Sequence, residues 1–212
     1  RIMAMAQMDI GDIDAAGNSL TRALSYAEAS VRVDIVATRF LCGRLALIMG
    51  DPEGSKLHLN AGLKAADSGD PESYGALLSA TYARALVSAG YEESGRAMLE
   101  SAQARLDDVA VPRMTQTLVV LALGWQALAE KELALGFARE AASMAGSRSF
   151  RYWNLVARSI VADLADEAEA FAAQNEAREI AIDLCRAVPP EYLEIFRKSS
   201  RIQPLLATEE EE

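Results

Sequence analysis

Small and apolar residues recur at helical spacing after four turn positions of the chain. The turn positions lie 39 or 40 residues apart, and they are Gly11, Gly50, Gly90 and Ala129. Five positions after each of them the residue is small: Ala16, Ser55, Gly95 and Ala134. Nine and twelve positions after them come Leu20 and Ala23, Leu59 and Gly62, Leu99 and Ala102, and Ala138 and Ala141. These offsets follow the i, i+4, i+7 rule, so they predict one packed stripe on a helix after each turn.

The helix before each turn also carries a small residue at a fixed position. Seven positions ahead of the turn lie Gly43, Ala83 and Ala122 in the second, third and fourth copies. A small residue there lets the two helices of a copy cross at close range. Each copy therefore predicts an antiparallel helix pair, and the fixed period predicts an array of pairs. Because alternating runs of Val, Ile and Thr are nearly absent, the predicted fold class is all-α.

The last part of the chain departs from this period. A fifth pair is expected to turn near residue 168, with helices over 150–163 and 166–187 and a connecting turn at Gly146 and Ser147. Pro189 and Pro190 end the preceding helix, and Pro190 suits the first turn of a new one. We therefore predict a repeat domain over 1–188, a C-terminal cap over 189–207 and an acidic tail over 208–212.

The order of small and bulky positions resembles the tetratricopeptide repeat, which has a small residue at position 8, Gly at 15, a small residue at 20, a bulky one at 24 and Ala at 27. The matching residues are Gly43, Gly50, Ser55, Leu59 and Gly62 in the second unit, and Ala83, Gly90, Gly95, Leu99 and Ala102 in the third. The chain lacks the aromatic residue of position 4, where it has Arg39, Ser79 and Leu118, and it lacks the closing proline. Its period exceeds the usual repeat of about 34 residues. It is similar to the long-repeat tetratricopeptide-like class of large bacterial signalling and transcription regulators.

This resemblance implies a right-handed superhelix, an α-solenoid of about five antiparallel helix pairs, with a concave face lined by the first helix of each pair. It implies a cytoplasmic, non-enzymatic scaffold, the repeat region of a larger regulator. Such a scaffold binds a protein or peptide segment, or another domain of its own polypeptide. Two alternatives remain open: a regulatory domain that senses a ligand or peptide, and a self-assembly module that forms homodimers.

The repeat pattern also selects the residues expected to bind a partner on the concave face. They are Phe40, Arg44, Leu47, Leu77, Arg84, Val87, Gln116, Leu123 and Gln126. Arg44 and Arg84 occupy the same position of neighbouring units, and the guanidinium fork suits carboxylates. We expect the two arginines to capture an acidic group of the partner. The alternative is that they pair with acids of adjacent repeats or extend into solvent.

Composition narrows the classes of function. A formal net charge of −10 argues against nucleic-acid binding, because an acidic surface repels phosphates. The longest strongly apolar window, residues 118–129, is too short to cross a membrane. The chain has one histidine, His58, no CxxC motif and no glycine-rich phosphate loop. We therefore predict no metal site, no cofactor and no catalytic residues.

The remaining chemically distinctive side chains have structural interpretations. His58 lies off the packed stripe of its helix and is expected to face solvent. Cys42 and Cys185 are expected to be buried free thiols. Trp125 and Trp153 are expected to pack between helices in the core.

Overall fold

The computed structural model describes residues 1–27, 32–67, 74–148 and 150–207, and this part is helical with no strand. Its helices are α1 (Ile2–Ile10), α2 (Ile13–Ala27), α3 (Arg32–Ile48), α4 (Pro52–Ala66), α5 (Gly75–Ser88), α6 (Glu92–Gln103), α7 (Val111–Ala127), α8 (Lys131–Arg148), α9 (Arg151–Leu164), α10 (Glu167–Ala187), α11 (Pro190–Arg197) and α12 (Gln203–Leu206). A short 3₁₀ turn, η1 (Leu106–Asp108), lies between α6 and α7. The all-α prediction is confirmed.

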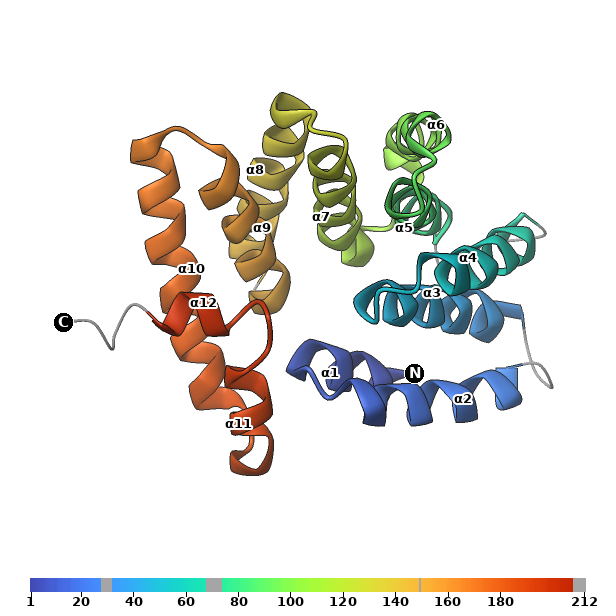
Figure 1. Ribbon diagram of the computed structural model, residues 1–212, viewed down its shortest axis with the longest axis horizontal. Helices are drawn as coiled ribbons and strands as arrows, with labels where there is room; N and C mark the ends of the chain where they lie inside the picture. Colours follow the sequence, from blue (N-terminus) through green and yellow to red (C-terminus); the bar gives the residue numbers. More distant parts are fainter. Residues whose placement is uncertain (28–31, 68–73, 149, 208–212) are drawn as a thin grey trace.

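Consecutive helices pack in pairs, and the pairs follow one another around an arc (Figure 1). The first helices of the pairs, α3, α5, α7 and α9, lie toward the inside of the arc, and their partners α4, α6, α8 and α10 lie outside. The arc brings its first and last helices together, with α11 beside α1. Among the described helices, none is long and apolar enough to cross a membrane.

The four turn positions share one backbone conformation. Gly11, Gly50, Gly90 and Ala129 have φ of 97°, 73°, 85° and 58°, in the left-handed region that suits glycine. After each of them the next N–H donates to a carbonyl five residues earlier, as in Asp12 to Gln7 at 2.9 Å and Glu130 to Trp125 at 3.0 Å. This is the Schellman end of a helix, so the sequence period is a period of helix termination.

The predicted packing stripe lies in the core. Leu59 and Leu99 are fully buried, as are Ala16, Ser55 and Ala134. Gly43 shows why a small residue precedes the turn: a Cβ built there would lie 2.4 Å from Leu59 Cγ. The Leu59 side chain of α4 thus occupies the space that the missing side chain of Gly43 leaves open on α3.

The fifth pair turns differently. Ala165 and Asp166 have extended backbone in place of a left-handed residue, and the Asp166 carboxylate accepts a hydrogen bond from the Glu169 N–H at 3.1 Å. The helix is therefore started by an aspartate cap. The helices agree with those expected over 150–163 and 166–187 to within a few residues.

The predicted connecting turn at Gly146 and Ser147 is wrong, because α8 continues to Arg148. A single glycine costs a helix only about 1 kcal/mol. The buried residues Ala141, Ala142 and Ala145 hold α8 against its neighbours up to this point.

The C-terminal segment packs on the last pair and also reaches the first. Phe196 and Ile202 are buried in the core that α7–α10 form. On the other side, a Cβ at Gly11 would lie 3.1 Å from Ser199 Cβ and 3.7 Å from the Ile195 carbonyl oxygen. The segment therefore bridges the two ends of the arc. The predicted acidic tail, residues 208–212, lies outside the described residues.

Candidate functional site

A cavity of about 230 Å³ lies on the inner side of the arc. Its walls come from the inner helices of four pairs and from the segment that joins α11 to α12. The lining residues are Phe40, Arg44, Leu47 and Ile48 of α3, Thr81 and Arg84 of α5, Val120 and Leu123 of α7, Tyr152, Trp153 and Val156 of α9, and Ser200 and Arg201. We call it the central cavity.

Arg44 is held in place by three groups of other helices. Its Nη2 donates to Asp9 Oδ1 at 2.5 Å, and its Cζ lies 5.0 Å from the centre of the Trp153 ring. It also interacts with the Tyr152 hydroxyl. Its Nη1 is buried and has no hydrogen-bond partner among the described residues. Arg44 is therefore fixed in the cavity wall with one donor left over.

Arg84 differs from Arg44 in having no acidic partner in the described part of the chain. No hydrogen bond or ion pair joins its side chain to another described residue. Burial, and after it the positive charges of Arg201 and Arg44, together lower the pKa of its guanidinium to about 10. Its side chain is half-buried, so the guanidinium loses part of its hydration without a compensating charge among the described residues.

The charges around the central cavity do not balance. Three arginines, Arg44, Arg84 and Arg201, interact electrostatically there, and among the described residues Asp9 is the carboxylate seen to couple to them. Burial raises the pKa of Asp9, while Arg44 and Arg201 act to lower it. Burial and the charge of Asp9 raise the pKa of Tyr152, so its hydroxyl stays protonated. The site is cationic within a chain whose formal net charge is −10.

Of the nine residues predicted for the concave face, five line the central cavity: Phe40, Arg44, Leu47, Arg84 and Leu123. Leu77 is fully buried in the core, so a partner has no access to it. Val87 lies against α6, since its Cγ2 would be 2.5 Å from a Cβ at Gly95. Gln116 and Gln126 are half-buried and lie outside the cavity wall.

The sequence pattern missed the other half of the site. Trp153 was expected in the core and instead is half-buried in the cavity wall, whereas Trp125 is buried as expected. Asp9 lies two positions before Gly11, as Ile48 lies two before Gly50, so the period could have found it, whereas Tyr152 and Arg201 belong to the last part of the chain, which departs from the period. One feature of the sequence could have pointed to Arg201: it is a charged residue directly before the apolar Ile202, in the segment after the cap helix. Its distance from Arg84, however, depends on the curvature of the whole array.

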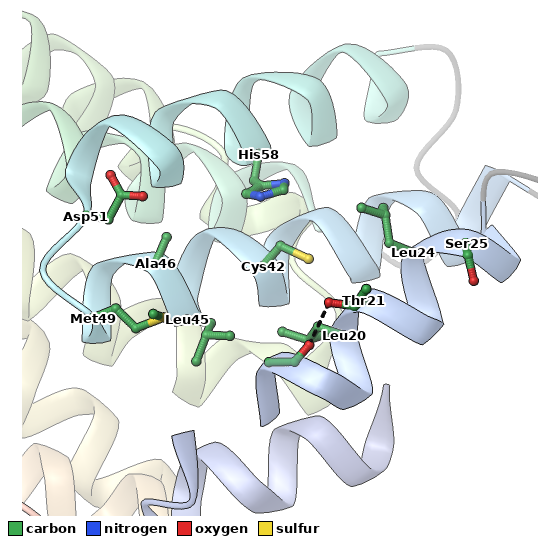
Figure 2. Close-up of a pocket in the computed structure, with 11 residues that line it drawn as sticks. Leu20, Thr21, Leu24, Ser25, Cys42, Leu45, Ala46, Met49, Asp51 and His58 are labelled. Carbon is green, nitrogen blue, oxygen red and sulfur yellow. Dashed lines mark hydrogen bonds between the residues drawn. The ribbon is translucent and has the colours of Figure 1, made fainter. Parts of the chain in front are cut away.

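A second cavity, of about 440 Å³, lies on the outer side between α2, α3 and α4 (Figure 2). Leu20, Cys42, Leu45 and His58 contribute to its wall. Burial raises the pKa of the Cys42 thiol, which keeps it protonated and unreactive. Cys185 is also a free thiol, but it is partly exposed rather than buried. In the described part of the chain no cluster of His, Cys, Asp and Glu could hold a metal ion.

The expectation that His58 faces solvent is wrong. Its ring is half-buried, and its Nδ1 lies 3.2 Å from Arg39 Nη1. The stripe residues Ser55, Leu59 and Gly62 face α3, and His58 lies one residue away from them. Its ring therefore turns toward Arg39 and the edge of the second cavity.

Acid is expected to weaken the fold through His58. Burial and the charge of Arg39 lower the pKa of its imidazole below the ordinary value of 6.5. Between the lowered pKa and 6.5 the unfolded chain binds more protons, so this contribution to stability rises with pH and is lost as pH falls. Urea unfolding of the wild type and His58→Gln at about pH 7 and about pH 5 isolates this contribution. The wild type should lose more stability than the variant, and equal losses would contradict the prediction.

No protein-family model matches the chain, and no curated protein is similar to it in sequence.

Proposed function

We propose that this chain is a non-enzymatic interaction domain that binds an acidic protein or peptide segment on its concave face. In this proposal the paired helices form a tetratricopeptide-like right-handed superhelix in a larger bacterial regulator. The arrangement of helices in pairs around an arc, with Schellman ends at one period, supports that assignment.

The observation that carries the proposal is the state of Arg84. Its guanidinium lies on the inner side of the arc, beside two further arginines and without an acidic partner among the described residues. Arg44, its counterpart in the preceding unit, is neutralised by Asp9. Arginine forks bind carboxylates in two parallel hydrogen bonds, so an acidic side chain would supply the missing charge.

The size of the central cavity limits how a segment can bind. About 230 Å³ lies below the range of roughly 300–1,000 Å³ usual for small-molecule pockets. One acidic side chain fits this space, and the rest of the segment would lie over the rim. Ile48, which is 47% exposed, offers an apolar contact at the rim.

Removing both inner arginines should weaken this binding strongly. We expect Arg44→Ala with Arg84→Ala to weaken affinity for Glu-containing peptides by tenfold or more, the effect of about 1.4 kcal/mol. Fluorescence anisotropy on a peptide array measures this, with each peptide paired to its Glu→Gln version. Arg22→Ala, an exposed arginine of α2, is the control for a change in net charge.

Circular dichroism checks that the double variant keeps its helices. Full affinity in a folded double variant would end the proposal. Equal binding of the Glu and Gln peptides by the wild type would also contradict it, since the arginines would then have no acidic group to recognise.

The enclosure of the site favours a second candidate, a domain that senses a small ligand. The inner face is covered on one side by Ser200 and Arg201 of the C-terminal segment. A small molecule would be surrounded there by helices from four pairs and by that segment.

A further inference from the structure

We propose that the central cavity binds a small organic anion, a carboxylate or phosphate joined to a compact apolar body, with Arg84 and Arg201 as its anion-binding residues. This inference rests on the proposed function, because it assumes that the inner face captures an acidic group. It goes further by naming a free small molecule as the ligand.

The excess of charge calls for an anion. Arg44, Arg84 and Arg201 come from parts of the chain far apart in sequence, and the fold places them within electrostatic range of one another. Asp9 offsets one of these charges. Like charges brought together in a partly buried site raise the free energy of the folded state, so a bound anion would relieve the repulsion.

The donors in the site suit an oxyanion. The guanidinium of Arg84 has no hydrogen bond to a described residue, and Arg44 has Nη1 unpaired. Thr81 is not available, because its hydroxyl donates to the Leu77 carbonyl oxygen at 2.7 Å. Carboxylates and phosphates accept two or more hydrogen bonds from such forks.

Apart from Thr81, Tyr152 and Ser200, the rest of the wall is apolar and suits a matching apolar body on the ligand. Phe40, Leu47, Val120, Leu123, Trp153 and Val156 supply it. A body of one aromatic or branched aliphatic group would fill a volume of about 230 Å³ together with its anion. A bare inorganic ion would leave the apolar wall uncovered and should bind more weakly.

Arg201 ties the ligand to the closure of the arc. The next residue, Ile202, is fully buried in the core of the last pairs, and Ser199 lies against the α1–α2 turn at Gly11. An anion shared by Arg84 and Arg201 would therefore join α5 to the segment that bridges the two ends. Binding should slow hydrogen exchange in residues 198–207.

The test titrates four probes into the protein: phenyl phosphate, benzoate, inorganic phosphate and succinate, with benzamide as the neutral control. Trp153 lines the cavity, so its fluorescence reports occupancy, and calorimetry gives the affinity. We expect phenyl phosphate or benzoate to bind with Kd of roughly 1 mM or tighter. Comparison of phenyl phosphate with benzoate separates a phosphate site from a carboxylate site. Inorganic phosphate and succinate, which lack the aromatic ring, test whether the apolar body is needed.

Two independent variants keep the proposal falsifiable. Arg84→Gln and Arg201→Gln should each weaken the best probe tenfold or more, while Arg22→Gln, an exposed charge-matched control, should leave it unchanged. Trp153→Phe should lose the fluorescence change, which assigns that signal to the central cavity. The assignment of the site would be overturned if Arg84→Gln and Arg201→Gln bound the best probe as tightly as the wild type. It would also be overturned if the wild type bound benzamide as tightly as benzoate.

The outcomes for the two proposals are distinguishable. Binding of Glu peptides without binding of any small probe would refute a small-molecule site and leave the proposed function in place. Binding of a small probe without binding of peptides would support the inference and refute the protein partner. Binding of neither would refute both.

Discussion

Leu59→Ala is expected to lower the free energy of unfolding by about 3 kcal/mol, as is usual for truncation of a fully buried leucine. Leu59 fills the space above Gly43, where a Cβ would lie 2.4 Å from its Cγ and 2.6 Å from Cδ2. Unlike most core truncations, this one should therefore be partly repaired by a second substitution on the facing helix.

Gly43→Ala alone should also destabilise, by about 1–2 kcal/mol. The overpacking against Leu59 costs roughly 1–3 kcal/mol, and the better helix propensity of alanine returns up to about 1 kcal/mol. In the Leu59→Ala background the same change should be neutral or stabilising, because the leucine atoms it would strike are gone. Urea unfolding of the four proteins of this double-mutant cycle measures the coupling.

Gly136→Ala in α8 is the matched control. Nothing lies within 4 Å of a Cβ built at Gly136, so the substitution should show only the gain in helix propensity. If Gly43→Ala cost the same with and without Leu59, close packing of the pair would not be the reason for glycine at position 43. The prediction of a packed small–large pair would then be wrong at its best-defined position.

The architecture was predictable because its determinants are local. A left-handed residue ends the first helix of each of the first four pairs, and glycine takes that conformation at little cost. Three of the four positions are glycine, and the fourth, Ala129, adopts the same φ although alanine does so at a cost. The period therefore extends to a fourth copy that has no glycine at its turn. The small residues that flank Ala129 at the repeat spacing made this fourth copy predictable.

The site was predictable only where it repeats. Arg44 and Arg84 share a position, so the pattern placed both on the inner face. The prediction that Leu77 binds a partner is wrong, because this part of α5 is buried on all sides: its neighbours Ala76 and Leu78 are buried as well. Tyr152 and Arg201 reach the cavity through the curvature of the arc and the return of the C-terminal segment. Neither is encoded at a fixed spacing.

Arg84→Met is expected to raise the free energy of unfolding, by about 1–3 kcal/mol. Replacing buried ion pairs with apolar side chains of similar volume is often neutral or stabilising by such amounts, and the half-buried Arg84 has no attractive partner among the described residues to lose. At Arg84 the gain should be favoured by the absence of an acidic partner and by repulsion from Arg201 and Arg44. Thermal and urea unfolding without added anions measure the difference.

Arg158→Met is the matched control with the opposite sign. Arg158 forms an ion pair with Glu176 and is half-buried, so its replacement removes a partner and should lower stability. If Arg84→Met destabilised to the same extent as Arg158→Met, the guanidinium of Arg84 would be satisfied within the fold, and the cationic site would lose its basis.

Added anion should reverse the order of stability. At a concentration of about 100 times Kd, a ligand that binds only the folded state stabilises it by about 2.7 kcal/mol. The wild type would receive this stabilisation from phenyl phosphate or benzoate, and Arg84→Met would not. A variant that is more stable alone and less stabilised with ligand would identify Arg84 as a residue kept for binding at the expense of stability, as functional residues often are. The same stabilisation of both proteins would show that the anion acts elsewhere on the chain.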